Sequence, residues 1–195
     1  FGIDAELLID HAWGYETCRM SDIKNYHSEE HSLSNGQVLM RNYSFDEALV
    51  IVREMTDNLV LDLFEKGLIT SSLTLWIAYD HRYEHEASKG TVKLERESNS
   101  SKKIIDAVED LYLRIADRYT GIRRIEVCAN RVAPESYVQY SLFDDPKQTD
   151  KERHLQEAVL NVKQRYGKNA IMRGSNLLEC STYRERNEQI GGHRA

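Results

Sequence analysis

The sequence feature that most constrains the fold is the run from Thr70 to Asp80, in which two kinds of side chain alternate. Alternation with a period of two is typical of a strand with one buried and one exposed face. The two sets are Leu73, Leu75, Ile77 and Tyr79, and Ser72, Thr74, Trp76 and Ala78. Because the first set is wholly apolar, we expect it to pack against a layer of helices, with the second set facing away.

Two helices are predicted around this strand. Residues 44–47, Ser-Phe-Asp-Glu, form a capping box, and apolar residues follow at helical spacing up to Gly67, which closes the helix. A serine at residues 100–101 caps the second helix. Its apolar stripe extends to Tyr119, and Gly121 is expected to end it.

Three further strands complete the pattern, over residues 37–43, 90–98 and 122–130, with a turn at 32–36 and a polar hairpin loop over 81–89. The order is β-α-β-β-α-β, which is the split βαβ arrangement. We therefore expect an α+β fold in which a four-stranded antiparallel sheet carries both helices on one face. The open face should carry Thr74, Trp76, Lys93 and Arg124.

Helices are also predicted on both sides of this module. An amphipathic stretch at the start of the sequence predicts a short helix that Gly14 ends, and a polar linker follows it. Residues 149–152 form another capping box, and the helix that it opens ends at Gly167. The rest, residues 168–195, is basic and has no period, so we expect a tail.

Composition narrows the class of protein. With 41% hydrophobic and 30% charged residues among 195, the chain has the composition of a soluble globular protein. No run approaches the roughly 20 apolar residues of a membrane span, and no signal peptide opens the sequence. Cys18, Cys128 and Cys180 lie far apart, which indicates reduced thiols in a cytoplasmic protein. Because the chain begins with Phe1 and not with Met, we expect a fragment of a longer protein.

The net charge of −6 excludes a strongly basic nucleic-acid-binding protein. The charge is uneven, because residues 151–195 contain nine basic and five acidic residues, a balance of +4 that leaves −10 for residues 1–150. Any contact with nucleic acid therefore has to come from a local patch.

Candidates for such a patch lie on the predicted open face and near the hydroxyl-rich turn at residues 32–36. Contacts to phosphates use hydroxyls, cations and backbone amides. The DNA-binding candidates are Lys24, Ser32, Ser34, Arg41, Thr74, Trp76, Lys93 and Arg124. The alternative is an ordinary solvated sheet face, which Glu95, Glu97 and Glu126 on or near the same surface favour.

No catalytic or metal-binding constellation is expected. His27 and His31, and likewise His81 and His85, are four residues apart, but neither pair lies in a helical pattern or has a clear third ligand. The chain has no Gly-rich phosphate loop and no G-x-S-x-G motif. We expect no catalytic residue, no metal site and no cofactor in this chain.

An isolated apolar pair, Leu142-Phe143, follows Gln139 and stands among polar and acidic residues that end at Pro146. Such a pair either packs back on the edge of its own domain or anchors a peptide in a pocket of a partner.

Short motifs accompany the β-α-β-β-α-β order along the chain: Gly2-Ile3-Asp4, Asp10-His11-Ala12-Trp13-Gly14, Lys24, Ser32-Leu33-Ser34, Gln37-Val38-Leu39, Gln139-Tyr140-Ser141-Leu142-Phe143, Asn169-Ala170-Ile171-Met172-Arg173-Gly174 and Arg186-Asn187-Glu188-Gln189-Ile190-Gly191-Gly192-His193. Together they resemble the C-terminal portion of a Y-family lesion-bypass DNA polymerase. The nearest branch is that of the UmuC-like (ImpB/MucB/SamB) repair proteins of Gram-positive bacteria, and the resemblance covers the whole chain.

The resemblance implies four parts: the end of a thumb over 1–23, a little-finger DNA-binding domain over 24–130, a linker over 131–149, and a C-terminal helix with a basic tail over 150–195. The linker would contain a peptide that binds the sliding clamp (beta clamp). Its contact residues would be Gln139, Ser141, Leu142 and Phe143, with Tyr140 at a position that is often Leu. Gln139 would bond at the rim of an apolar cleft that the Leu-Phe pair fills.

The same resemblance implies that the catalytic carboxylates and their Mg²⁺ ions belong to a palm upstream of this chain. The parent would be a DNA-directed DNA polymerase of translesion synthesis in the SOS damage response, and this part would grip template-primer DNA without catalysis. A second class also fits the predicted fold, namely a ferredoxin-like ligand-sensing or dimerisation domain that pairs through its open sheet face.

Overall fold

The computed structural model describes residues 4–25, 32–82, 84–136, 146–190 and 193–194. Contacts divide the chain into two units, residues 1–30 and residues 31–195. The first unit contains helices α1 (Asp4–Ala12) and α2 (Met20–Asn25). As predicted, α1 is followed by Gly14, whose φ of 77° is a conformation that glycine adopts without strain.

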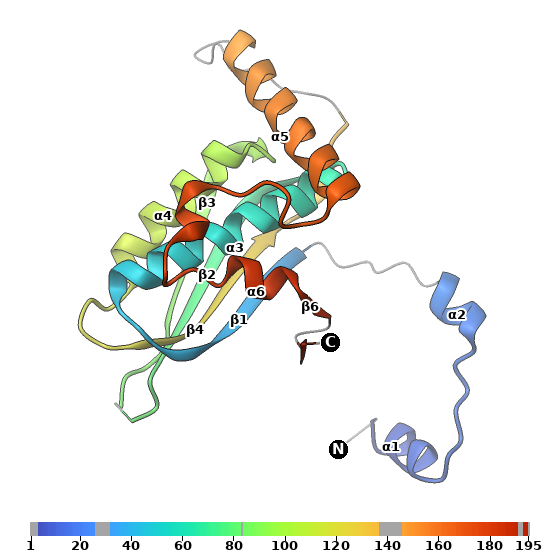
Figure 1. Ribbon diagram of the computed structural model, residues 1–195. Helices are drawn as coiled ribbons and strands as arrows, with labels where there is room; N and C mark the ends of the chain where they lie inside the picture. The colour runs from blue at the N-terminus through green and yellow to red at the C-terminus, as the bar shows by residue number, and fades with distance from the viewer. Residues whose placement is uncertain (1–3, 26–31, 83, 137–145, 191–192, 195) are drawn as a thin grey trace. The chain divides into compact units, whose positions relative to one another are not determined.

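The second unit is built on an antiparallel sheet (Figure 1). Its four long strands are β1 (Ser32–Tyr43), β2 (Leu68–Tyr79), β3 (Ser88–Ser98) and β4 (Ile122–Asn130), in the order β1-β4-β2-β3. A two-residue strand, β5 (Ala133–Pro134), pairs with the start of β2. The sequence predicted the four long strands and did not predict β5.

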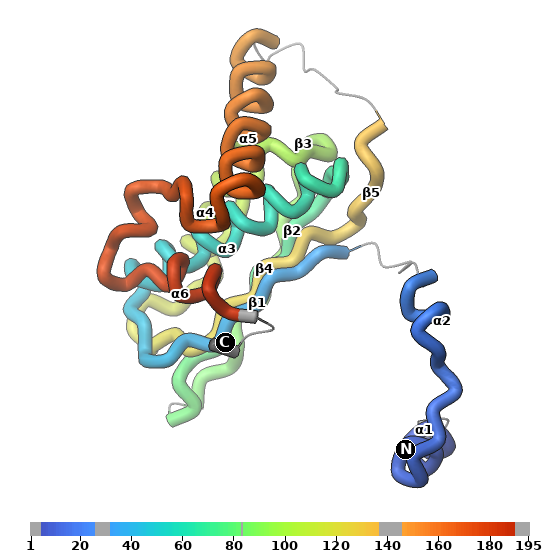
Figure 2. Tube along the Cα trace, turned by 45° about the vertical axis from the view of Figure 1, so that its right-hand side comes forward, coloured from blue at the N-terminus to red at the C-terminus, as the bar shows by residue number. Residues whose placement is uncertain are grey.

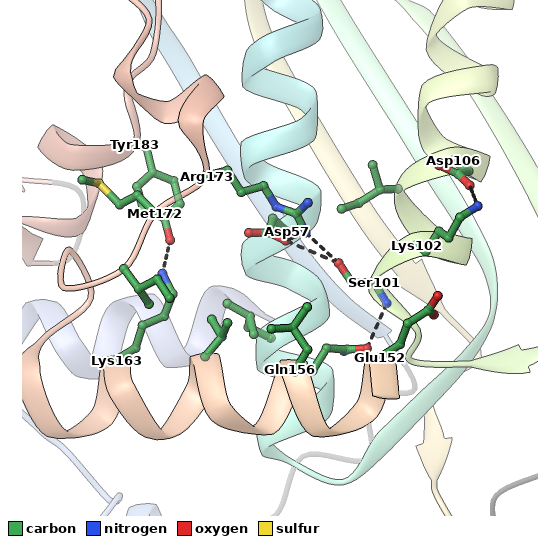
Figure 3. Close-up of a pocket in the computed structure, with 15 residues that line it drawn as sticks. Asp57, Ser101, Lys102, Asp106, Glu152, Gln156, Lys163, Met172, Arg173 and Tyr183 are labelled. Carbon is green, nitrogen blue, oxygen red and sulfur yellow. Dashed lines mark hydrogen bonds and ion pairs between the residues drawn. The ribbon is translucent and has the colours of Figure 1, made fainter. Parts of the chain in front are cut away.

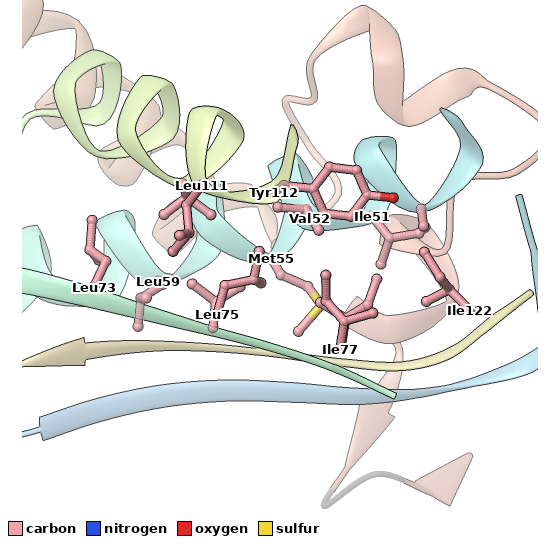
Figure 4. Close-up of a cluster of buried hydrophobic side chains, with 14 of the residues drawn as sticks. Ile51, Val52, Met55, Leu59, Leu73, Leu75, Ile77, Leu111, Tyr112 and Ile122 are labelled. Carbon is pink, nitrogen blue, oxygen red and sulfur yellow. The ribbon is translucent and has the colours of Figure 1, made fainter. Parts of the chain in front are cut away.

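Helices α3 (Phe45–Glu65) and α4 (Ser101–Ile115) lie side by side on one face of this sheet (Figure 1). Apolar side chains of both helices meet those of the central strands in a single core (Figure 4). Leu73, Leu75 and Ile77 of β2 are fully buried in it, so the alternation in the sequence marked the correct face. The predicted α+β fold with both helices on one face is confirmed.

The capping residues in the sequence predicted where both helices begin. Ser44 and Glu47 form the predicted capping box at the start of α3. The hydroxyl of Ser100 accepts a hydrogen bond from the amide of Lys103 and caps α4. The buried Tyr112 of α4 donates its hydroxyl to the carbonyl of Phe45 at 2.7 Å, which ties the two helix ends together.

The chain then returns to the helical layer from outside. Helix α5 (Pro146–Tyr166) contacts α3, and the tail runs back from its end past α3 towards β1 (Figure 2). The tail contains the 3₁₀ helix η1 (Gly174–Leu177), helix α6 (Tyr183–Asn187) and the two-residue strands β6 (Gln189–Ile190) and β7 (His193–Arg194). None of the helices in the described ranges is both long enough and apolar enough to cross a membrane.

Several predicted boundaries were wrong. Residues 32–36 belong to β1 and form no turn, because they pair with β4 from Ser32 opposite Asn130 onwards. Strand β3 begins at Ser88, two residues before the predicted start. The linker after α1 contains α2. Tertiary pairing outweighs a local preference for turns when a partner strand is available.

The other errors concern helix ends. Helix α4 ends at Ile115, so Tyr119 lies beyond it and is 96% exposed, and Gly121 is not its terminator. Helix α5 begins at Pro146, three residues before the predicted capping box at Thr149. Proline suits the first position of a helix, because its missing N–H has no partner there in any case.

Candidate nucleic-acid interface

The sheet face that α3 and α4 leave uncovered carries polar side chains in rows across the strands. The antiparallel register sets the rows, because every second residue of each strand points to this face. Across β1, β4, β2 and β3 the rows are Ser32, Asn130, Ser72 and Lys93, then Ser34, Cys128, Thr74 and Thr91, then Gly36, Glu126, Trp76 and Lys89. A fourth row has Val38, Arg124 and Ala78. We call these residues the open face.

Trp76 is the largest side chain of the open face, and charged groups surround it. The guanidinium carbon of Arg124 lies 5.1 Å from the centre of the Trp76 ring, a cation–π distance. Arg124 also approaches the carboxylate of Glu126 at 3.5 Å. Lys89 stands opposite Trp76 on the neighbouring strand. The centre of the open face therefore combines an aromatic ring, two cations and one carboxylate.

A hydrogen-bonded group of small polar side chains lies one row further along. The hydroxyls of Thr74 and Thr91 are 2.9 Å apart, and Asn130 donates to the Thr74 hydroxyl at 2.9 Å. The thiol of Cys128 donates to the side-chain oxygen of Asn130 at 3.3 Å, and burial raises the pKa of this thiol. These bonds fix the positions of the hydroxyls, as backbone-directed phosphate contacts require.

Six of the eight DNA-binding candidates lie on the open face: Ser32, Ser34, Thr74, Trp76, Lys93 and Arg124. The other two lie elsewhere. Lys24 belongs to α2 in the first unit. Arg41 turns to the start of α3, where it bonds both carboxylate oxygens of Glu47 and lies 4.2 Å from the centre of the buried Tyr43 ring.

Arg41 and Glu47 form an ion pair that joins β1 to the start of α3 and so stabilises the fold. The bonds from Arg41 and from the backbone of Ser44 lower the pKa of Glu47 to about 2. The guanidinium is thus bound to a carboxylate that is ionised at neutral pH.

Sequence reasoning missed Lys89 and Asn130 as members of the open face. Both could have been found by extending the period of two. Lys89 lies two and four residues before Thr91 and Lys93, but it was assigned to the preceding loop. Asn130 lies two residues after Cys128 at the end of β4.

The predicted clamp-binding residues Gln139, Ser141, Leu142 and Phe143 lie outside the described residues. The stretch that contains them connects β5 to α5. The described residues before it include β5, in which Ala133 pairs with Ile69 at the start of β2.

A groove of about 460 Å³ lies on the opposite, helical side, between α3, α4, α5 and the tail (Figure 3). Its walls are mostly apolar. Two of its cations are paired with carboxylates, Arg173 with Asp57 at 2.6 Å and Lys102 with Asp106 at 2.9 Å, and Lys163 donates to the hydroxyl of Tyr183. The cations of this mostly apolar groove therefore bond within the protein, which does not favour a phosphate site.

No cluster of three or more His, Cys, Asp or Glu side chains suited to a metal ion occurs in the part of the chain that the structure describes. His81 and His85, within that part, approach single carboxylates, Asp80 at 3.7 Å and Asp117 at 3.5 Å.

The part of the chain that forms the sheet and helices α3 and α4 matches a known protein family. Residues 30–142 match the model of the impB/mucB/samB family C-terminal domain. DNA polymerase IV 2 of Bacillus subtilis is 25% identical over 164 residues, which are 83% of this chain and 39% of that protein. DNA polymerase IV 2 of Halalkalibacterium halodurans is 21% identical over 168 residues, 86% of this chain and 40% of that protein. The chain thus spans about two fifths of these relatives.

Solved structures show weaker similarity. The little finger domain of PolIV, in a complex with the beta-clamp processivity factor, is 12% identical and covers 58% of this chain and 100% of its own, with a TM-score of 0.41. A Y-family DNA polymerase chimera, Dbh-Dpo4(243-245)-Dbh, is 16% identical over 68% of this chain and 36% of its own, with a TM-score of 0.40. The assignment of a family rests on the sequence match to residues 30–142.

Proposed function

Because this chain belongs to the impB/mucB/samB family and contains its C-terminal domain, the little finger of Y-family DNA polymerases, we propose that it grips template-primer DNA. In this proposal the open face contacts the DNA backbone, and residues 139–143 tether the parent polymerase to the sliding clamp. The parent acts in translesion synthesis, and its catalytic carboxylates lie outside this chain.

The composition of the open face is the observation that carries the DNA proposal. Hydroxyls and cations alternate there with Trp76, and Lys93 and Arg124 are exposed. Hydroxyls and cations bind phosphates whatever the base sequence is. A lesion-bypass polymerase needs contacts of this kind, because it has to hold damaged and undamaged DNA alike.

The open face is suited to weak binding. It presents three cations, Lys89, Lys93 and Arg124, and Glu126 reduces the positive potential at its centre. The chain as a whole has a net charge of −6. Tight binding by this chain alone is therefore not expected, and the rest of the parent polymerase has to supply further contacts.

Substituting cations of the open face tests the DNA proposal. We expect Lys93→Ala and Arg124→Ala each to weaken binding about threefold to tenfold at low salt, because each removes one phosphate contact. Arg114→Ala is the matched control, since Arg114 is exposed in the last turn of α4 on the helical side. Fluorescence anisotropy with two primer-template duplexes of unrelated sequence measures the effect.

The loss should be equal for both duplexes. A loss on one duplex only would mean that these side chains read bases, and a loss equal to that of Arg114→Ala would remove the open face as the contact surface.

The clamp proposal rests on the sequence Gln139-Tyr140-Ser141-Leu142-Phe143 and on its place between β5 and α5. An apolar pair beside a polar anchor is suited to an apolar cleft with a polar rim. Leu142→Ala combined with Phe143→Ala should abolish co-elution with the sliding clamp and leave the circular dichroism spectrum unchanged.

Leu177→Ala combined with Leu178→Ala is the control, because this pair is also adjacent and apolar, with exposed fractions of 68% and 51%. Co-elution should survive in the control. If the 142/143 double variant still co-elutes with the clamp, these residues do not form the anchor.

A further inference from the structure

We propose that residues 168–188 of the tail form a brace, which positions the edge strand β1 and thereby holds Ser32 and Ser34 in place on the open face. The tail lies beyond residues 30–142, which match the family's domain. The proposal rests on the proposed DNA-binding function, and its test is chosen so that the two can fail separately.

The tail is anchored on the helical layer at two points (Figure 3). Arg173 donates hydrogen bonds to Asp57 of α3 at 2.6 Å and to the hydroxyl of Ser101 of α4 at 3.0 Å. Tyr183 is only 1% exposed, and its hydroxyl accepts a hydrogen bond from the ammonium group of Lys163 of α5. The tail therefore joins α3, α4 and α5 and does not lie loosely over them.

From this anchor the tail reaches β1. The hydroxyl of Thr182 donates to the side-chain oxygen of Gln37 at 3.1 Å, and Arg186 donates to the same oxygen at 3.3 Å. The amide of Thr182 donates to Glu54 of α3 at 3.3 Å. Two tail residues thus converge on one side chain of β1.

Gln37 faces the helical layer, since it stands opposite the buried Ile125 of β4. Its neighbours Gly36 and Val38 face the other side and belong to the open face. A bond that fixes the side chain of Gln37 therefore also fixes which residues of β1 face the DNA.

Strand β1 needs such support. In the described part of the chain its only long strand partner is β4, and their register is irregular between Val38 and Tyr43. Its other side-chain bonds to α3 in the described residues join Arg41 to Glu47, at the far end of the strand, and Asn35 to the carbonyl of Met55 at 3.4 Å. Ser32 and Ser34 lie on this strand, on the opposite face from the tail.

The charges around Arg186 favour one fixed position over a loose contact. Burial lowers the pKa of Arg186, and the nearby carboxylates of Glu54 and Asp62 oppose that effect. Glu54 is 2% exposed, and its Oε1 atom has no hydrogen-bond partner. A buried guanidinium whose charge is stabilised by nearby carboxylates tolerates displacement poorly, because moving it away from them leaves the cost of its burial uncompensated.

Two variants remove the brace from opposite sides. Gln37→Ala deletes the acceptor on β1, and Thr182→Ala deletes one donor on the tail while leaving the backbone bond to Glu54. Gln164→Ala is the control, because Gln164 bonds to Glu65 of α3 at 2.9 Å and does not reach β1. The readouts are amide hydrogen exchange of β1 compared with β3, and DNA affinity by anisotropy.

We expect both variants to speed amide exchange in residues 32–38, to leave β3 unchanged, and to weaken DNA binding up to about fivefold, the scale of one neutral hydrogen bond. The double variant should be no worse than Gln37→Ala alone. Unchanged exchange in residues 32–38 would overturn the brace.

Faster exchange with unchanged DNA affinity would overturn its role in DNA binding, provided that Lys93→Ala still weakens binding. If Lys93→Ala and Arg124→Ala also have no effect on affinity, the proposed function fails, and amide exchange alone decides whether the tail braces β1.

Discussion

Glu47 takes part in two local structures at once. Its carboxylate accepts a hydrogen bond from the backbone amide of Ser44 at 2.9 Å as part of the capping box, and it accepts two hydrogen bonds from Arg41. Glu47 thus joins the end of β1 to the start of α3. Both interactions favour the ionised carboxylate, which is why the pKa of Glu47 falls to about 2.

This pKa makes part of the stability depend on pH. Because the folded-state pKa lies below the unfolded value of 4.5, the stabilisation is complete above about pH 4.5 and is lost as the pH falls through about 2. We expect Glu47→Gln to lower the free energy of unfolding by about 1 kcal/mol at neutral pH, the typical value of a helix cap. Urea unfolding at neutral pH and at about pH 2 measures the difference, which should vanish at the acidic end.

Glu97→Gln is the matched control, because Glu97 is exposed near the end of β3. Its substitution should change the free energy of unfolding little at either pH. If Glu47→Gln costs as much in acid as at neutral pH, the carboxylate is not the group that stabilises this junction.

At the level of secondary-structure elements, the sequence predicted best where a local rule coincides with the tertiary structure. The alternation in β2 gave the correct face for each residue from Ser72 to Tyr79, because a central strand buried on one side leaves no other register. The capping box of α3 gave its first residue for the same kind of reason. On the open face, Thr74, Trp76, Lys93 and Arg124 were placed correctly by the period of two alone.

The elements that could not be predicted depend on distant partners. The start of β1 has a turn-like sequence and becomes a strand only through β4, almost 100 residues later. Arg41 lies two residues from each of the inward-facing residues Leu39 and Tyr43, so the period of two places it on the helical side. Its bond to Glu47 of α3 could not be predicted from that period. The contacts of the tail to Gln37 and Glu54 join residues more than 120 positions apart, and no periodicity records them.

At the level of the whole molecule, charge is distributed unevenly with respect to the open face. Residues 151–195 have a balance of +4, but α5 and the tail up to α6 pack on the helical side (Figure 2). The open face itself has Glu126 between its cations. Net charge therefore says little about DNA affinity here, and the position of each charge relative to the open face decides its effect.

Glu126→Gln tests this directly. Removing the carboxylate beside Arg124 and Trp76 should strengthen DNA binding about threefold at low salt, and the gain should shrink as salt screens the charges. Glu157→Gln changes the net charge equally, but Glu157 is exposed on α5, on the helical side. Anisotropy titrations of both variants over a series of salt concentrations separate the two effects. Equal gains would mean that DNA responds to net charge alone and that the open face is not its binding surface.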